Sequence, residues 1–384
     1  MKTLPDNPNL DHLRRQAKDL LTGLRGIRPE ASLADAQTSL AEQYGFRTWT
    51  DLKAEVDRTR GRFDVADPAL AQQIADRFGL GTVAGAMRSL SRPDEVGRRW
   101  QLETDRGRWL ARTVDDVFPP TDGAENARFQ EAAAGAGVTL PMPVRSTADN
   151  VIEELGGHQW RLYASVKSGP PLVAPVSPAV TYAVGGILAA LHRLRFPADR
   201  ICPWSSMRLA TRGWAELADL ATAKEVPWAP ALTDALPALT SLTEVGDGTP
   251  EQPVLCHNNL SPGNVRVGAG GRLVVTGWEH AAGLPPSWEL AFALVNWSVH
   301  AGGEVHTEAA RALVAGYGKA PELTLASFRG TAIGLENYVS GQIEVALHAS
   351  EPEEVRFADR NVRHLLGHLT TRETFDRVLA AVRG

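Results

Sequence analysis

The loop from His257 to Asn264 gathers side chains that could do chemistry. It holds one imidazole and three amides, from Asn258, Asn259 and Asn264. An imidazole can carry a proton, whereas an amide can only donate or accept hydrogen bonds. An apolar pair, Val254-Leu255, leads into the loop. A polar loop held between apolar flanks is a common setting for a binding or catalytic site.

Two β-branched runs follow the loop and should position it. They are Val265 to Val267 and Arg272 to Thr276, joined by Gly268-Ala269-Gly270-Gly271. This pattern predicts a hairpin whose glycines supply positive φ at the turn. A Gly/Pro loop comes after Trp278, and an apolar helix should begin at Ser287.

This stretch resembles the aminoglycoside phosphotransferase and choline kinase family, which has the protein-kinase-like fold. The family carries an HxDxxxxN loop, whose Asp orients and deprotonates the acceptor hydroxyl and whose Asn holds a metal ion. A second Asp, before an aromatic residue, holds the metal that bridges the phosphates. His257 and Asn264 match this pattern. Asn259 stands at the catalytic Asp position, and Gly277, before Trp278, at the metal-binding Asp position.

The loss of both carboxylates should be costly for phosphoryl transfer. Asn259 can accept a hydrogen bond from a hydroxyl but cannot take its proton, and a general base contributes about 10²–10⁴-fold. Gly277 offers no side-chain oxygen, so Mg²⁺ would keep only Asn264 and phosphate oxygens, a poor ligand set. Glu279 or Glu95 could supply the missing charge only after the backbone rearranges.

The resemblance also implies residues that bind ATP. Arg112 matches the basic residue that grips the phosphates, and its acidic partner on the next helix is either Glu125 or Glu131. The family covers the phosphates with a glycine-containing turn. Ser91 to Arg98 stands there with one glycine, a proline and two acids, which would repel phosphate. Binding of ATP and Mg²⁺ is therefore left open.

The resemblance implies an α+β, bilobal protein-kinase-like fold with a helical appendage. We expect an N-terminal helical module at residues 1–62, a sheet-rich nucleotide lobe at 68–168 and a helical substrate lobe at 170–384. Lys167 to Pro171 resembles the hinge between lobes. Acceptor pockets of the family are built from variable helices of the second lobe, so the ligand cannot be read from the sequence.

The N-terminal module should contain three helices. Apolar residues recur at helical spacing from Leu10 to Leu24, and a second helix is expected from Ser32 to Tyr44 with Gly45 just past its end. The capping pattern from Thr48 to Asp51 predicts a third helix to about Arg60. A protein partner could dock on residues 1–62, and a solvated bundle without a partner is the alternative.

Periodicity places the remaining elements. Alternation predicts a hairpin from Trp100 to Val114 around Asp105 to Arg108. Further strands are expected at 151–155 and 160–166, and further helices at 69–78, 178–194, 214–224, 231–242, 288–300, 305–317, 323–347 and 353–382. Trp288 and Trp297 should lie in the core, and His192 should be packed rather than a ligand.

Composition excludes several classes of protein. Hydrophobic residues make up 43% and charged residues 22% of 384 residues, which is typical of a soluble globular chain. The net charge of −5 favours neither nucleic acid nor a membrane surface as partner. Two cysteines form no disulfide framework, which favours a cytoplasmic protein. The abundance of Arg, Ala and Gly suggests a bacterial source. His364 and His368 have metal-binding spacing but no third ligand nearby.

Three functions remain open. In the first, a pseudokinase has lost phosphotransfer and acts by binding, in a biosynthetic pathway. A small metabolite or a peptide would lie in the interlobe cleft, or the surface would bind a partner enzyme. In the second, the chain is an unusual ATP-dependent phosphotransferase that acts on a hydroxyl of a small molecule or a peptide. In the third, the old cleft hosts another reaction, with His257, Asn259, Glu279 or His280 as actors. Coordinated loss of the base, the metal ligand and the phosphate turn favours the first.

Overall fold

A computed structural model gives the fold of this chain. It describes residues 10–28, 30–46, 49, 52–53, 55–56, 65–90, 98–115, 117, 122–246, 251–300, 302–349 and 352–383. The turn expected over the phosphates from Ser91, with Glu95, and the capping pattern from Thr48 to Asp51 lie outside these residues. Most of the third N-terminal helix lies outside them too.

The chain divides into two compact units. The first joins residues 1–116 with 144–165, and the second joins 117–143 with 166–384. Residues 1–62 therefore cluster with the sheet, whereas residues 117–143, expected in the sheet lobe, cluster with the helices of the second unit.

The first unit begins with two antiparallel helices, α1 (Leu10–Ile27) and α2 (Leu33–Gln43). Ser32 and Asp35 form a reciprocal capping box at the start of α2. Gly45 adopts a φ of 78° just past its end, as its position predicted. Leu13, Ala17, Leu40, Ala41, Leu52 and Val56 form a small core of their own.

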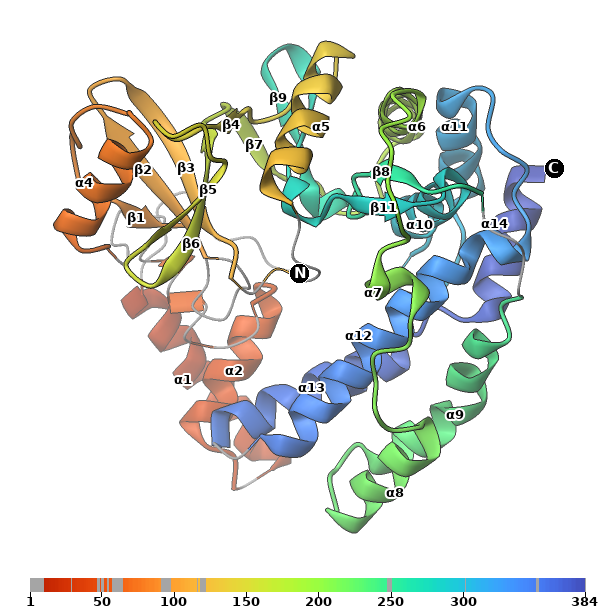
Figure 1. The fold of residues 1–384 in the computed structure, drawn as a ribbon. Helices are drawn as coiled ribbons and strands as arrows, with labels where there is room; N and C mark the ends of the chain where they lie inside the picture. Colours follow the sequence, from red (N-terminus) through yellow and green to blue (C-terminus); the bar gives the residue numbers. More distant parts are fainter. Residues whose placement is uncertain are drawn as a thin grey trace. The chain divides into compact units, whose positions relative to one another are not determined.

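The main sheet of the first unit has the order β1-β2-β3-β6-β4, with β5 also paired to β6. Its strands are β1 (Arg88–Ser89), β2 (Arg99–Thr104), β3 (Gly107–Thr113), β4 (Pro143–Val144), β5 (Ile152–Leu155) and β6 (His158–Ala164). The pairs β1–β2, β2–β3, β3–β6 and β5–β6 are antiparallel. The β2–β3 hairpin and the two later strands confirm the pattern read from the sequence. Figure 1 shows helix α4 (Pro68–Arg77) against one face, where it shares a core with β2, β3 and β6.

The second unit contains two small sheets. Strands β7 (Ser168–Pro171), β9 (Val265–Gly268) and β10 (Leu273–Val275) form one, in the order β10-β9-β7. Strands β8 (Val254–Cys256) and β11 (Ala282–Leu284) form the other. The segment that resembled a hinge is thus strand β7, which pairs with β9.

Ten α-helices surround these sheets in the described part of the second unit. They are α5 (Gly123–Gly135), α6 (Pro178–Arg193), α7 (Pro203–Ser206), α8 (Trp214–Ala223), α9 (Ala229–Thr243), α10 (Pro286–Ser298), α11 (Thr307–Tyr317), α12 (Arg329–His348), α13 (Pro352–Gly367) and α14 (Arg372–Arg383). One core lies around α6, α10 and α11, and a second joins α8, α9 and α13 to the end of α12. Trp288 and Trp297 are buried, as expected.

The expectation of one helix over 353–382 was wrong. Helix α13 ends at Gly367, and α14 begins at Arg372. Glycine is a poor helix former, and the backbone N–H of Thr371 donates to the Thr374 hydroxyl at 3.3 Å, which caps a new helix start. The break between Gly367 and Arg372 could not be predicted from periodicity, because apolar residues continue at helical spacing across it.

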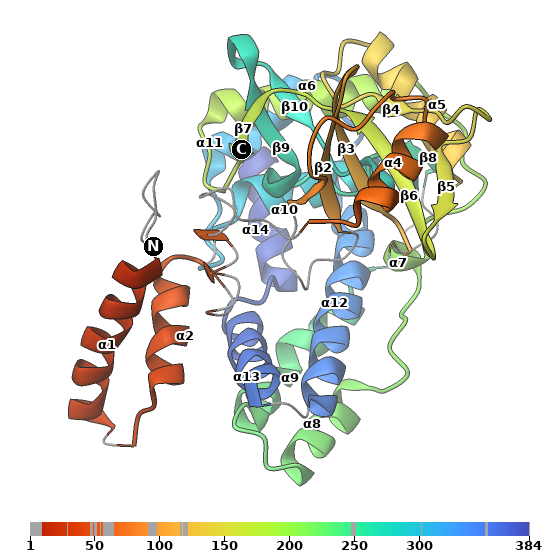
Figure 2. The ribbon, with the colours of Figure 1, turned by 90° about the vertical axis from the view of Figure 1, so that its left-hand side faces the viewer.

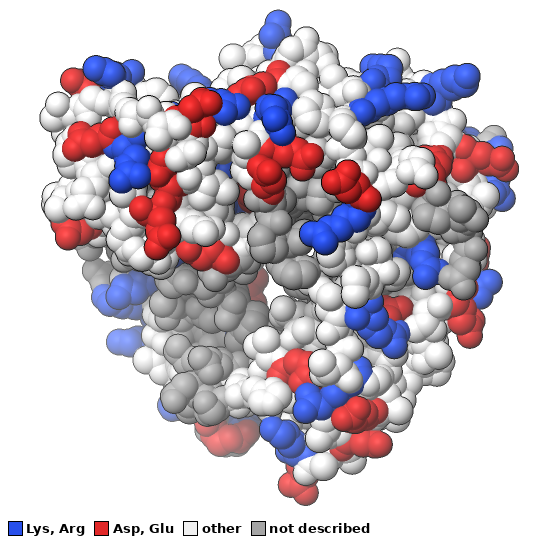
Figure 3. Space-filling model, in the orientation of Figure 1, with Lys and Arg blue, Asp and Glu red and all other residues white. Residues whose placement is uncertain are grey.

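Charged side chains are mixed on the surface. On the face in Figure 3, acidic and basic groups alternate and neither sign covers a broad area. No helix in the described part of the chain is both long and apolar enough to cross a membrane.

Candidate functional site

The loop singled out from the sequence connects β8 to a short 3₁₀ turn at Pro262–Asn264 and then to β9. The predicted hairpin is confirmed as β9 and β10, with Val265 opposite Val275. Gly270 and Gly271 adopt φ values of 66° and 76° at its turn. The Trp297 indole donates to the Leu260 carbonyl at 2.8 Å, which holds the loop against α10.

His257 is a structural residue of this loop. Its side chain is fully buried, its Nε2 donates to the Thr276 carbonyl at 3.0 Å, and its Nδ1 accepts from the Asn259 backbone N–H at 3.3 Å. Burial lowers the pKa of His257 to about 4, although Glu289 and Glu279 oppose the shift. The imidazole is therefore neutral at physiological pH, and both its nitrogens are engaged.

Glu289 fixes the backbone of the loop, a role that was not predicted from the sequence. Its Oε1 accepts from the Asn258 backbone N–H at 2.5 Å. Asn258 adopts the left-handed conformation, with a φ of 60°, and its amide also donates to the His280 carbonyl at 3.2 Å. One feature of the sequence could have indicated this role, since Glu289 is an acidic residue within the apolar start of α10. A buried carboxylate needs hydrogen-bonding or charged partners.

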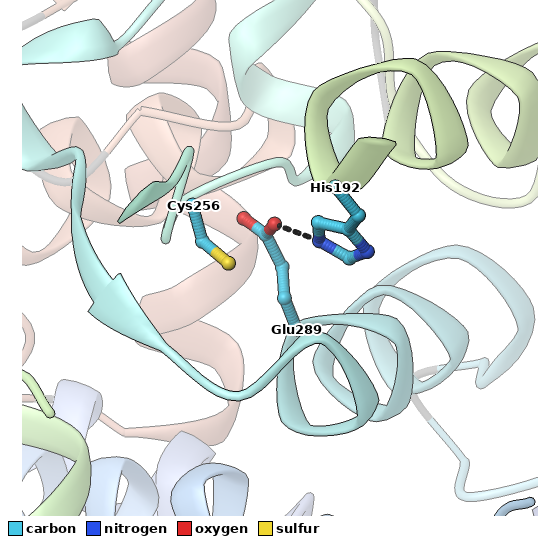
Figure 4. A group of neighbouring side chains, drawn as sticks. All are labelled: His192, Cys256 and Glu289. Carbon is cyan, nitrogen blue, oxygen red and sulfur yellow. Dashed lines mark hydrogen bonds and ion pairs between the residues drawn. The ribbon is translucent and has the colours of Figure 1, made fainter. Parts of the chain in front are cut away.

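A buried network supports Glu289 from behind. Figure 4 shows its carboxylate beside the His192 ring and the Cys256 sulfur. Glu289 Oε2 lies 2.7 Å from His192 Nε2, and His192 Nδ1 lies 2.7 Å from the Tyr317 hydroxyl. Burial would raise the pKa of Glu289, but the hydrogen bond and charge of His192 bring it below its usual range. His192 is thus packed, as expected.

The same three side chains have residue types that can bind a metal ion. The ligand atoms of His192, Cys256 and Glu289 lie within 4.8 Å of one another. Burial and the nearby Glu289 carboxylate raise the pKa of Cys256 well above its usual value, which keeps the thiol protonated. The Cys256 thiol donates to the Leu284 carbonyl at 3.4 Å, and Glu289 is hydrogen-bonded to His192 at 2.7 Å. The cluster is instead a hydrogen-bonded support for the loop.

Asn259 and Asn264 face each other across the loop. The Asn264 amide donates to the Asn259 carbonyl at 2.9 Å, and the Asn264 carbonyl accepts from the backbone and hydroxyl of Thr276 at 2.8 and 3.0 Å. Among the described residues, nothing hydrogen-bonds to the side-chain amide of Asn259, which is half-buried. That amide is available to a ligand.

The position of Gly277 leaves little room for a side chain. Gly277 has a φ of 84°, and a Cβ added there would lie 2.7 Å from Asn264 Cγ. Positions 264 and 277 together offer one amide oxygen. This donor set does not fit Mg²⁺, which prefers carboxylate and phosphate oxygens in an octahedral arrangement.

Glu279 and His280 follow in the short 3₁₀ turn at Trp278–His280. Glu279 is 3% exposed, and burial lowers the pKa of His257 although the charge of Glu279 acts in the opposite direction. The His280 carbonyl accepts a hydrogen bond from the side-chain amide of Asn258. Trp278 packs edge-on against His257 at 4.8 Å, and its carbonyl accepts from Asn126 of α5 at 2.7 Å.

The expected nucleotide contacts belong to different units. Arg112 lies on β3 of the first unit, and Glu125 and Glu131 lie half-buried on α5 of the second. Which of the two acids pairs with Arg112 stays a prediction.

Comparison with known proteins agrees with this architecture. The family model described as "Phosphotransferase enzyme family" matches residues 92–323. The chain is similar to spectinomycin phosphotransferase APH(9)-Ia solved with ADP and spectinomycin, at 12% identity and a TM-score of 0.55, covering 81% of this chain and 98% of that one. It is also similar to amicoumacin kinase hAmiN solved with AMP-PNP and Ca²⁺, at 12% identity and a TM-score of 0.55, covering 82% of this chain and 97% of that one.

A third similar structure is an aminoglycoside phosphotransferase from Alicyclobacillus acidocaldarius, at 13% identity and a TM-score of 0.52, covering 79% of this chain and 94% of that one. At these identities the likeness shows the fold, and it confirms the predicted kinase-like architecture. No curated protein matches the chain.

Proposed function

This chain belongs to the phosphotransferase enzyme family, and we propose that it acts by binding a ligand rather than by transferring a phosphoryl group. One observation carries the proposal. The loop keeps its internal hydrogen bonds around His257 and Asn264, while the two positions that would carry carboxylates hold Asn259 and Gly277.

The loop lacks the general base and the carboxylate metal ligand that phosphoryl transfer uses. Phosphoryl transfer needs a positioned acceptor and metal neutralisation of phosphate charge. Asn259 cannot act as a base, and neutral His257 has no lone pair left for one, since Nδ1 already accepts from Asn259. Loss of a base alone costs about 10²–10⁴-fold. The lone amide oxygen of Asn264 is a weak substitute for a carboxylate on the metal.

A rigid loop is still useful for binding. The Asn258–Glu289 hydrogen bond fixes the backbone, which lowers the entropic cost of presenting the Asn259 amide to a ligand. A ligand hydroxyl or carbonyl could bond to this amide. The ligand class we propose is a small metabolite, a peptide or a segment of a partner enzyme.

The test is a turnover measurement. Purified protein is incubated with ATP and Mg²⁺, and released phosphate and ADP are quantified beside the Asn264→Ala variant. We expect the wild-type rate to equal that of the variant and of buffer. Turnover that requires Mg²⁺ and disappears in Asn264→Ala would contradict the proposal and assign a working metal site.

A second experiment asks whether the missing carboxylates matter for the native role. Restoring them together, as Asn259→Asp with Gly277→Asp, should leave that role unchanged or impaired. Gly271→Asp is a control for the backbone, because Gly271 also has positive φ but has nothing within 4 Å of an added Cβ. A gain of native activity in the double variant alone would count against the binding function.

An unusual phosphotransferase is the second candidate. The intact hydrogen-bond frame from Asn259 to Thr276 supports it, because a catalytic loop also needs a fixed backbone to position an acceptor hydroxyl. The turnover experiment above decides between the two. A third function, with His257 as a base in another reaction, is disfavoured by the engagement of both its ring nitrogens.

A further inference from the structure

Two exposed histidines, His364 and His368, lie one turn apart at the end of helix α13. The inner face of this helix carries Ala358, Val362 and Leu366, which belong to the core shared with α8, α9 and α12. Successive residues of a helix are rotated by about 100°, so each histidine projects almost opposite to the core residue two positions before it. The pair therefore lies on the outer face of α13.

The two imidazole rings lie against each other. Their centroids are 4.3 Å apart, and the ring planes are inclined by 36°. His368 follows the last helical residue, and its backbone N–H donates to the Leu365 carbonyl at 3.2 Å, which continues the turn. The two side chains are therefore neighbours in the way that residues at i and i+4 are within a helix.

A hydrogen bond fixes the tautomer of neutral His368. Its Nδ1 lies 2.8 Å from the backbone carbonyl of His364, which can only accept, so Nδ1 carries the proton. The lone pair of the ring is then on Nε2. Histidines that bind a metal ion through one nitrogen almost always donate the other N–H to a carboxylate, a backbone carbonyl or water. His368 already has the hydrogen bond of a metal ligand.

The surroundings of His364 also suit a cation. The His364 ring makes no hydrogen bond or ion pair with any residue that the structure describes. The neighbouring Arg363 guanidinium is engaged elsewhere, because it donates to the Pro227 carbonyl at 2.7 Å. The C-terminal end of a helix carries partial negative charge, which stabilises a cation near the last turn.

We propose that His364 and His368 bind one divalent transition-metal ion of the class that includes Zn²⁺, Ni²⁺ and Cu²⁺. The ligands are one ring nitrogen of His364 and Nε2 of His368, and water completes the coordination. Metal–nitrogen bonds are about 2.0–2.1 Å long, so one ion reaches two rings that lie this close. Imidazole suits these ions, whereas Mg²⁺ and Ca²⁺ prefer oxygen ligands.

The bound ion links the last turn of α13 to the residue that follows the helix. This is the point where the chain leaves α13 and turns towards α14, which begins at Arg372. An ion that binds the folded chain more tightly than the unfolded one stabilises the fold. The site uses none of the residues of the loop at 257–264, so it exists whether or not that loop binds a ligand.

Helix α12 supplies a matched control at its own C-terminus. His348 is exposed, and its Nδ1 lies 2.8 Å from the Glu344 carbonyl, which is the same i, i+4 bond that His368 makes. The Glu344 carboxylate is engaged, since Arg212 donates to both of its oxygens at 2.8 Å. His348 therefore has the same position and tautomer but no second imidazole four residues before it.

The experiment is a calorimetric titration of the untagged full chain with Zn²⁺ after removal of trace metals with EDTA. Burial raises the pKa of both Cys202 and Cys256, so these thiols should not compete for the ion. We expect excess Zn²⁺ to raise the melting temperature by several degrees, Cu²⁺ to bind more tightly and Mg²⁺ to have no effect. The electron paramagnetic resonance spectrum of bound Cu²⁺ should show two imidazole nitrogens.

The variants separate the pair from other histidines. His364→Gln and His368→Gln should each weaken Zn²⁺ binding by about 100-fold, because the second ligand of a chelate binds intramolecularly. Both side chains are exposed, so the circular dichroism spectrum should not change. His348→Gln should bind Zn²⁺ like the wild type. Unchanged affinity in either variant of the pair, an equal loss in His348→Gln, or no binding of Zn²⁺ and Cu²⁺ by the wild type would overturn the proposal.

Discussion

His257 and Asn259 stand two residues apart in one loop but have different roles. His257 is buried, with both ring nitrogens bonded to the backbone. The side-chain amide of Asn259 is half-buried, and the backbone N–H of Asn259 donates to His257 Nδ1. His257 therefore stabilises the loop, and Asn259 presents a polar group. The residue types alone do not predict these two roles.

The buried neutral state of His257 predicts a pH dependence of stability. Its pKa falls from 6.5 to about 4 on folding, so the unfolded chain binds more protons between these values. Stability from this group is present above its unfolded pKa and is lost as pH falls. We expect a loss of about 2 kcal/mol between about pH 7.5 and about pH 5.

Urea unfolding at both pH values measures this loss, and His257→Gln is the comparison. The variant should be less dependent on pH over this window. The depressed pKa of Glu289 acts only at lower pH, because that stability is lost below the unfolded value of 4.5. An unchanged pH slope in His257→Gln would contradict the assignment.

At the scale of elements, helices α6 and α11 approach closely enough for their backbones to touch. A Cβ on Gly185 would lie 2.0 Å from the Leu313 carbonyl oxygen, and one on Gly316 would lie 1.9 Å from that of Tyr182. This packing brings His192 at the end of α6 to Tyr317 at the end of α11. The helix contact thus supports Glu289 and, through it, the loop.

Gly185→Ala should therefore destabilise the protein strongly. The added methyl group meets backbone that cannot move without separating the helices, and overpacking of this kind costs at least about 2 kcal/mol. Gly186→Ala is the matched control, since its Cβ would lie 3.8 Å from the nearest atom. It should be neutral or stabilise by up to about 1 kcal/mol. Equal effects of the two changes on urea unfolding would refute close packing.

At the scale of the whole molecule, the chain is built from cores that do not share residues. Residues 10–56 contribute a small core of their own, distinct from the core of the sheet and α4. The second unit has two main cores, and α12 contributes Ala332 to one and Ile343 to the other. Its length lets one helix join the loop region to the outer helices.

Removal of residues 1–62 should leave a folded remainder. The core around α4 and the sheet lies wholly beyond residue 62, and Val65 still pairs with Arg88. We expect the truncated chain to melt cooperatively within a few degrees of the main transition of the full chain. Loss of cooperative melting, followed by circular dichroism, would mean that the helical module is part of the sheet's fold.

The loop, the hairpin after it and the lack of carboxylates at positions 259 and 277 could be predicted from the amino-acid sequence. These features depend on residues close together in the chain, where local backbone preferences and spacing suffice. The resemblance of the loop to the family implied the kinase-like fold, and apolar periodicity predicted most of the helices because it reports burial.

Other features of the site depend on contacts between residues that are far apart in the chain. Glu289 reaches Asn258 from a helix 31 positions away, and burial rather than residue type makes His257 neutral. Strand register places Arg99, Arg112 and Arg161 side by side across the main sheet. Register is set by pairing between distant segments, and a shift of one residue would turn these side chains to the opposite face.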